Sequence, residues 1–270
     1  TQPDLENIRN KFLDMPVAVI GAGPSLNDAI PFLQKYQNYF LIITVDTALR
    51  SLIKNNIFPH IVCILESNDF SWRSIKECGY ENIAILATDT ANPQIFTVES
   101  RKKITVFLDT VNSSREMSAL LQRSMISACG TVSTIAFNVA LVSGASPIFL
   151  FGQDLCFTKD SRYAKNSLFD NETMMEKYHE VQQKNPSTLT LKEKIFINHE
   201  NILSWYDSIE QRKERAKMFT LEERAFMSSM HGLSAGAMAN TVTCVDVEGK
   251  TKLTTNSYKS CARWFGLQAK

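Results

Sequence analysis

Three turns of the sequence combine glycine with hydroxyl, amide or carboxylate side chains. Gly21-Ala22-Gly23-Pro24-Ser25-Leu26 follows an apolar run and opens a helical pattern, and its glycines let backbone N–H groups approach an anion at a helix N-terminus. Gly130-Thr131-Val132-Ser133-Thr134 places hydroxyls at a second helix start, and Gly152-Gln153-Asp154 ends another apolar run. We expect the three turns to meet, because ligands of open α/β sheets bind outside the carboxyl ends of the strands.

The first and third turns also have ordinary structural interpretations. The first departs from the dinucleotide-binding fingerprint, because Leu26 stands where a third glycine is needed for close packing. It is either an anion site or a plain strand-to-helix turn. As an anion site, it predicts that Gly23→Val abolishes nucleotide binding and leaves the fold intact. Asp154 either contacts a ligand or caps the turn after its strand.

Two further carboxylates, Asp46 and Glu66, follow apolar runs of strand length. Either one is suited to bind ribose hydroxyls or to act as a general base. The sequence lacks the patterns of several other catalytic sites. Gly249-Lys250-Thr251 lacks the first glycine of a phosphate-binding loop, and neither Gly-x-Ser-x-Gly nor Asp-x-Asp occurs. The four histidines are not spaced as metal ligands. We therefore expect no metal among the site residues, and Glu66 is the carboxylate to test first.

Apolar runs of strand length alternate with helical patterns from about residue 12 to residue 158. Strands are expected at residues 16–21, 40–45, 61–65, 83–87, 104–108 and 147–151, and helices at 25–36, 47–55, 113–124 and 131–142. Nearly continuous apolar strands separated by helices are typical of a parallel sheet that is covered on both faces. The sequence predicts a doubly wound, mostly parallel, Rossmann-like α/β core that binds a nucleotide.

The remainder of the chain divides into two parts. Residues 159–230 are charged and helical without a convincing strand, and they are interpreted as a helical insertion or lid that moves more than the sheet and becomes ordered when the donor binds. Residues 231–270 contain a strand at 242–247, a Glu248-Gly249-Lys250 turn and a helix at 256–267. This return strand is expected to join the main sheet and to complete the core.

The composition narrows the class of partner. Lys and Arg number 29 against 28 Asp and Glu, a net charge of +1, whereas a nucleic-acid-binding domain is usually more basic. No apolar run approaches the roughly 20 residues of a membrane-spanning helix. The six cysteines are scattered without a Cys-x-x-Cys pair, which indicates reduced thiols. We expect a cytoplasmic protein with no nucleic-acid partner and no membrane span.

Several short motifs together give the sequence a resemblance to the central domain of the motility accessory factor (Maf) proteins, a bacterial family linked to flagellin glycosylation. The resemblance spans about residues 15–265 and is carried by Gly21-Ala22-Gly23-Pro24-Ser25-Leu26, Val45-Asp46-Thr47-Ala48-Leu49, Gly130-Thr131-Val132-Ser133-Thr134, Phe151-Gly152-Gln153-Asp154-Leu155, Lys252-Leu253-Thr254-Thr255-Asn256 and Arg263-Trp264-Phe265. The Maf family is in turn similar to bacterial sialyltransferases that use a CMP-activated nine-carbon acid.

The resemblance implies roles for individual residues. Phosphate contacts are implied for Arg162 and Tyr163 in a lid, although Tyr163 has the alternative of packing on the insertion with its hydroxyl in water. Glu66, Asp154 and Tyr163 form the predicted catalytic set. Two positions depart from the family: Cys156-Phe157 stands where a second phosphate-binding Tyr is expected, and Lys252 is nearest to an expected catalytic His. Nucleotide contacts are predicted for Gly21, Gly23, Pro24, Ser25, Asp46, Gly130, Thr131, Ser133 and Gln153.

The resemblance implies a glycosyltransferase that moves a nonulosonic acid of pseudaminic or legionaminic type to Ser or Thr of flagellin. The CMP-activated sugar is then a donor substrate, and no cofactor is required. A second branch similar to this domain suggests a hydroxymethyl-dihydropterin pyrophosphokinase that uses ATP and Mg²⁺, with Asp46, Glu66 and Asp154 as metal carboxylates. A third hypothesis is a non-catalytic nucleotide-binding module that docks flagellin through the insertion.

Overall fold

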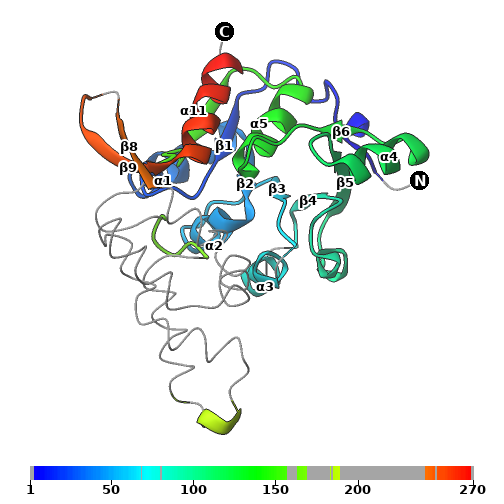
Figure 1. The fold of residues 1–270 in the computed structure, drawn as a ribbon, viewed down its shortest axis with the longest axis horizontal. Helices are drawn as coiled ribbons and strands as arrows, with labels where there is room; N and C mark the ends of the chain where they lie inside the picture. Colours follow the sequence, from blue (N-terminus) through cyan, green and yellow to red (C-terminus); the bar gives the residue numbers. More distant parts are fainter. Residues whose placement is uncertain are drawn as a thin grey trace.

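A sheet of seven parallel strands forms the centre of the molecule (Figure 1). The structure, a computed structural model, describes residues 3–67, 69–79, 81–156, 163–168, 183, 185–188, 241–246 and 248–268. In the order of the sheet, the strands are β6 (Met125–Ile126), β5 (Lys102–Leu108), β4 (Ala84–Thr88), β3 (Ile61–Ile64), β2 (Leu41–Val45), β1 (Val17–Ile20) and β7 (Ile148–Phe151). The predicted Rossmann-like α/β fold is confirmed.

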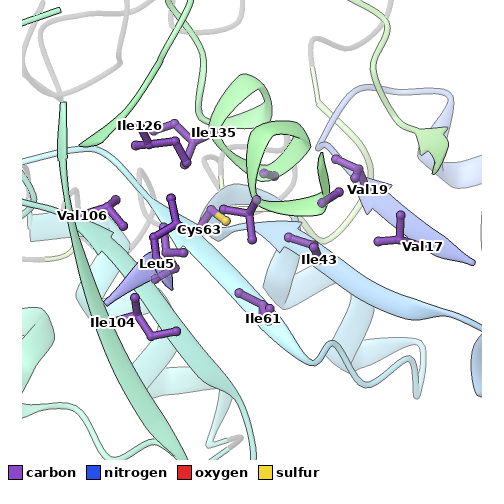
Figure 2. Close-up of a cluster of buried hydrophobic side chains, with 14 of the residues drawn as sticks. Leu5, Val17, Val19, Ile43, Ile61, Cys63, Ile104, Val106, Ile126 and Ile135 are labelled. Atoms are coloured by element: carbon purple, nitrogen blue, oxygen red, sulfur yellow. The ribbon is translucent and has the colours of Figure 1, made fainter. Parts of the chain in front are cut away.

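Both faces of the sheet are buried in the central strands, which are nearly continuous runs of aliphatic residues, whereas Phe149 and Leu150 of the edge strand β7 are each 42% exposed. Successive side chains of a strand point to opposite faces: Val17 and Val19 belong to one hydrophobic cluster, and Ala18 and Ile20 to another. Figure 2 shows the first cluster, in which strand residues meet Ile135 of α5. Helices pack against both clusters, as a doubly wound sheet requires.

The helices lie on both faces of this sheet (Figure 1). One face is covered by α1 (Leu26–Tyr36), α2 (Asp46–Lys54) and α3 (Asp69–Cys78), and the other by α5 (Val132–Val142) and the short η1 (Leu5–Asn7). The remaining elements of the core are α4 (Asn112–Leu121), η2 (Gln37–Tyr39) and η3 (Pro93–Thr97). In the described part of the chain, no helix combines the length and the apolar character needed to cross a membrane.

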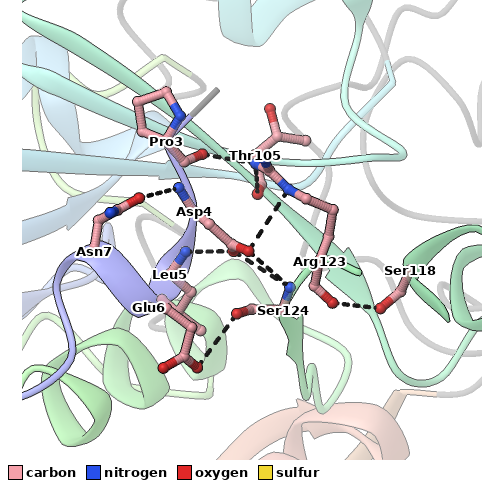
Figure 3. A network of polar contacts seen from close by, with 9 residues as sticks. All are labelled: Pro3, Asp4, Leu5, Glu6, Asn7, Thr105, Ser118, Arg123 and Ser124. Carbon is pink, nitrogen blue, oxygen red and sulfur yellow. Dashed lines mark hydrogen bonds and ion pairs between the residues drawn. The ribbon is translucent and has the colours of Figure 1, made fainter. Parts of the chain in front are cut away.

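The N-terminal segment is fixed to the β6 end of the sheet by a network of polar contacts (Figure 3). The Asp4 carboxylate accepts a hydrogen bond from the Ser124 backbone N–H at 3.0 Å and forms an ion pair with Arg123 at 3.6 Å. The Arg123 guanidinium also donates to the Pro3 carbonyl at 2.7 Å. These contacts hold Leu5, which is 2% exposed, inside the cluster between the sheet and α5.

The C-terminal residues form a separate unit of one hairpin and one helix. The hairpin pairs β8 (Thr241–Val245) with β9 (Thr251–Thr255) in antiparallel register, and α11 (Asn256–Gln268) follows. The expectation that this return strand joins the main sheet is wrong, because β8 pairs with β9 in a two-stranded sheet of its own. The unit reaches the core through α11, where Trp264 and Phe265 pack edge-on against Phe137 of α5.

The predicted insertion at residues 159–230 lies mostly outside the described residues, so its mobility and the division into three parts remain predictions. Its described residues 163–168 are anchored on the core. The Ala164 N–H donates to the Ala22 carbonyl at 2.8 Å, and the Leu168 N–H donates to the Thr47 carbonyl at 3.2 Å. Both side chains are buried. This short stretch therefore covers the N-terminal ends of α1 and α2.

Candidate functional site

The strand order reverses direction between β1 and β7. From β1 the chain builds β2 to β6 successively on one side, and then returns to place β7 on the other side. Val17 is paired with Leu41 of β2 and with Ile148 of β7. Ligands of open α/β sheets bind in the crevice outside such a switch point, because the two connections leave in opposite directions there. The turns at residues 21–25 and 152–155 both lie at this point.

These two turns approach each other so closely that glycine is required on both. The Gly21 N–H donates to the Phe151 carbonyl at 2.8 Å, and the Gly23 N–H to the Gly152 carbonyl at 2.9 Å. A Cβ at Gly21 would lie 2.6 Å from the Gly152 oxygen, and one at Gly23 would overlap the Asp154 carboxylate. A valine at position 23 therefore requires one of the two turns to shift. Loop-to-loop packing accounts for these glycines without a ligand.

Asp154 lies against the N-terminal end of α1. Its Oδ2 accepts hydrogen bonds from the Ser25 hydroxyl at 2.9 Å and from the Ser25 backbone N–H at 3.2 Å. A carboxylate is stabilised there by the helix dipole, so Asp154 acts as the cap that α1 otherwise lacks. Because this anion already occupies the first turn of α1, the arrangement favours ligand hydroxyl groups over a second anion beside Asp154.

The turn before α5 offers a second helix N-terminus near the same crevice. Val132, at the start of α5, packs against the hydrophobic cluster that also contains Ala22 and Leu26. Thr134 orders this turn, since its hydroxyl donates to the Thr131 carbonyl at 2.7 Å and accepts from the Cys129 N–H at 2.9 Å.

The polar groups of the α5 turn are not all used by the fold. Gly130 is exposed and has a φ of +74°, while Thr131 and Ser133 are half-buried. Among the described residues, the buried Thr131 hydroxyl and the buried Gln153 amide nitrogen have no hydrogen-bond partner. Gln153 lies over the first turn, because a Cβ at Gly21 would be 2.7 Å from its Nε2. Two unused polar groups therefore border the crevice.

Asp46 directly follows β2, the neighbour of β1 in the sheet, and Glu66 follows β3, the next strand beyond β2. Asp46 is 2% exposed, and its carboxylate accepts hydrogen bonds from the Thr47 N–H at 2.8 Å and from the Ser71 hydroxyl of α3. Burial raises the pKa of Asp46, although these donors partly oppose the shift. Glu66 has an exposed side, but desolvation by the surrounding chain raises its pKa, and the negative charge of Asp46 raises it further.

The three carboxylates do not form a metal centre. Asp154 faces Ser25 beside β7, whereas Asp46 is directed at Ser71. Among the described residues, no three His, Cys, Asp or Glu side chains gather closely enough to hold a metal ion. The structure therefore does not bring Asp46, Glu66 and Asp154 together as the three metal carboxylates of the pyrophosphokinase hypothesis.

The predicted lid residues are only partly placed. Tyr163 is half-buried and packs against the apolar cluster of α1, α2 and the first turn, close to Ala164 and its hydrogen bond to Ala22. Arg162 lies outside the described residues. The ring of Tyr163 thus packs on the core, and its proposed contact with a phosphate stays a prediction.

Two residues that matter in this region were not singled out from the sequence. Ser71 holds Asp46 from α3, a helix that the sequence analysis did not predict. Thr254 donates from its hydroxyl to the Leu155 carbonyl at 2.6 Å, which fixes the turn that carries Asp154. Thr254 lies in one of the motifs of the Maf resemblance, so a signal for it was present, whereas nothing in the sequence around Ser71 indicated its partner.

The fold and the candidate site define an α/β protein with polar turns at the switch point of a parallel sheet. The chain belongs to the MptE-like family, whose model, described as 6-hydroxymethylpterin diphosphokinase MptE-like, matches residues 1–160. No curated protein matches the chain significantly.

A solved structure extends the comparison to the C-terminal part. The fold is similar to that of a Maf glycosyltransferase from Magnetospirillum magneticum AMB-1, with a TM-score of 0.57 and 17% sequence identity over 97% of this chain. The match covers 33% of the other chain, so this chain spans about a third of that protein's length. The resemblance to the Maf proteins is thus confirmed at the level of the fold.

Proposed function

We propose that the protein is a glycosyltransferase that moves a nonulosonic acid from a CMP donor to Ser or Thr of a protein acceptor, flagellin. The observation that carries this proposal is the contact between the polar turns at residues 21–25 and 152–155 at the β1–β7 switch point. The shared fold with a Maf glycosyltransferase supports it, because that likeness includes the C-terminal hairpin and helix, which the family model does not reach.

The crevice offers separate positions for the two halves of the nucleotide. Asp154 is suited to accept hydrogen bonds from ribose hydroxyls, whereas the α5 turn with Thr131 and Ser133 presents backbone N–H groups and hydroxyls to a phosphate. Phosphate binding at α5 rather than at α1 avoids repulsion by the Asp154 carboxylate.

The transfer itself requires a base and a stabilised leaving group. The acceptor hydroxyl attacks the anomeric carbon, the bond from that carbon to the CMP phosphate oxygen breaks, and a base accepts the hydroxyl proton. Glu66 is suited to this task because its residue is exposed to solvent and because its pKa is raised toward neutral pH. A Tyr163 hydroxyl that donates to the departing phosphate would act mainly in the transition state. In that case Tyr163→Phe lowers turnover on the order of ten- to a thousandfold and leaves donor affinity nearly unchanged.

A comparison of nucleotides tests the class of ligand. Thermal unfolding is measured with CMP, and with ATP in the presence and absence of Mg²⁺, for the wild type and for Asp154→Asn. We expect CMP to raise the melting temperature of the wild type and to have less effect on the variant, because a ligand that binds only the folded state stabilises it. No stabilisation by CMP would exclude the proposal. Transfer is then read as a mass increase of flagellin, which Glu66→Gln should abolish.

A pterin pyrophosphokinase is a second candidate, favoured by the description of the matching family model. Since the described carboxylates do not gather into a metal centre, any Mg²⁺ would depend on phosphate oxygens for most of its ligands. Stabilisation by ATP with Mg²⁺ but not by CMP would establish this candidate in place of the glycosyltransferase. Binding of CMP without transfer, together with retention of flagellin, would instead support a non-catalytic module.

A further inference from the structure

The turn that carries Asp154 has an unusual backbone. Gly152 and Leu155 both have positive φ values, +63° and +50°. Gly152 adopts this conformation without cost, but a bulky residue such as Leu155 is rarely found there and is strained. Such a conformation persists only when its surroundings fix it. Gln153 and Asp154 lie between these two residues, so the direction of the Asp154 carboxylate depends on what holds Leu155.

Thr254 of β9 makes the contact that holds Leu155. Its side chain is 1% exposed, and its hydroxyl donates to the Leu155 carbonyl at 2.6 Å. Within the hairpin, Thr254 is paired with Val242. The next residue, Thr255, caps α11 by accepting the Tyr258 N–H at 3.1 Å. The hydrogen bond of Thr254 therefore comes from a position where the hairpin and the helix are both fixed.

The other side of the crevice is held by the same C-terminal unit. The Cys261 thiol of α11 donates to the Cys129 carbonyl, just before the α5 turn. A Cβ at Gly130 would lie 3.0 Å from the Ser257 hydroxyl and 3.6 Å from the Cys261 sulfur. The β9–α11 unit thus contacts two of the three turns that border the crevice.

We propose that Thr254 is a positioning residue: through the Leu155 carbonyl it aims Asp154 at Ser25 and so couples the C-terminal unit to the crevice. Loss of the Thr254 hydroxyl leaves a buried carbonyl without its donor and lets Leu155 relax toward negative φ. Relaxation at Leu155 rotates the preceding peptide and moves the Asp154 carboxylate away from the Ser25 N–H. The consequence for ligand binding rests on the proposed function, whereas the change at Ser25 does not.

The ligand-free protein provides the first test. The amide resonance of Ser25 is recorded by ¹H–¹⁵N NMR in the wild type, in Asp154→Ala, and in Thr254→Val, which has nearly the same shape but no hydroxyl. We expect Thr254→Val to move the Ser25 resonance in the same direction as Asp154→Ala, and Thr254→Ser to restore it. Thr243→Val is the matched control, because this exposed threonine of β8 lies in the same hairpin. A Ser25 resonance that moves in Asp154→Ala but not in Thr254→Val overturns the proposal.

A second variant tests whether the effect of Thr254→Val comes from the lost hydroxyl or from misfolding. Thr254→Ala also lacks the hydroxyl but places no methyl group against the carbonyl, and it must shift Ser25 in the same way. CMP affinity is then measured on every folded variant. We expect it to weaken on the order of tenfold in Thr254→Val, comparable to the loss of one hydrogen bond to a charged group, and to recover in Thr254→Ser. If Ser25 shifts while the wild type itself does not bind CMP, the positioning role stands and the proposed function fails.

Discussion

Gly23→Ala is the substitution for which the structure gives the sharpest expectation. The added Cβ would overlap the Asp154 carboxylate and would lie 2.8 Å from the Gly152 carbonyl oxygen. The carboxylate can rotate away, but only by giving up its hydrogen bonds to Ser25. The Gly152 oxygen belongs to the backbone and accepts the Gly23 N–H at 2.9 Å, so it can move only together with the turn after β7.

The expected cost follows from these two adjustments. Overpacking of a close contact costs about 1–3 kcal/mol. Loss of the hydrogen bonds to the carboxylate adds about 1 kcal/mol, below the usual value for charged groups, because Ser25 is exposed to water. We therefore expect Gly23→Ala to lower the free energy of unfolding by about 2–4 kcal/mol. That is a large share of the roughly 5–15 kcal/mol that is typical of a folded domain.

Urea unfolding followed by circular dichroism measures this loss, with Gly266→Ala as the control. Gly266 lies in α11, and a Cβ there meets no atom within 4 Å. Its replacement by alanine should stabilise the protein by about 0.5–1 kcal/mol, because glycine is unfavourable inside a helix. A double-mutant cycle with Asp154→Ala isolates the overlap itself, since Gly23→Ala should cost at least about 0.5 kcal/mol less once the carboxylate is gone.

The result of this cycle is decisive for the site. If Gly23→Ala costs the same with and without the Asp154 carboxylate, the two turns are not packed as described. A neutral Gly23→Ala would refute the close approach of the turns altogether. In either case the glycines of the first turn would again need a ligand to explain them.

Three further predictions concern protonation, thiol reactivity and packing. Raising the pH from about 4 to about 7 should lower the unfolding free energy of the wild type more than that of Glu66→Gln. Folding raises the pKa of the Glu66 carboxyl, so the folded state binds this proton more tightly than the unfolded state, and the resulting stabilisation is lost as the pH rises through the folded pKa. Equal slopes of unfolding free energy against pH would contradict this prediction. The pKa of the buried Cys261 thiol is raised to about 12, mainly by desolvation. Iodoacetamide should therefore modify Cys261 more slowly than the half-buried Cys244, as measured by mass spectrometry after brief treatment. Equal rates of modification would count against the burial of Cys261. Ile43 lies in the cluster under α5, and Ile43→Ala should lower the unfolding free energy measured with urea by about 2–5 kcal/mol. Leu13 is 64% exposed, and Leu13→Ala should change the unfolding free energy by less than about 0.5 kcal/mol. Similar losses for the two variants would show that the cluster is not the core.

The strands of the core were predictable because burial on both faces demands continuous aliphatic runs. The run at 40–45 became β2, the run at 147–151 became β7, and the expected helix at 131–142 became α5, each within about one residue. The elements that were missed have weaker patterns. Strand β6 has only two residues, and β9 is a polar Thr-Lys-Leu-Thr-Thr segment that is stabilised by its pairing with β8.

The candidate site was predictable in its residues but not in its contacts. Glycine-rich turns at strand ends identify a crevice, because their positions follow from the local pattern. The hydrogen bond from Ser25 to Asp154 joins positions 129 apart, and no local signal encodes such a pairing. The same holds for Thr254 and Leu155, which are 99 apart. Sequence patterns also did not reveal that Asp154 itself occupies the N-terminal end of α1.

The order of the strands also determines when the crevice is formed during synthesis. β2 to β6 each add beside the strand made just before, whereas β7 must return to the open edge of β1, which was made first. A growing chain that stops short of residue 148 therefore has a nearly complete sheet but only one of the two turns at the switch point. Such long-range pairings form late because the loop they close is long. Ligand-binding competence in this fold is thus acquired in the last steps of assembly, well after most of the apolar core is in place.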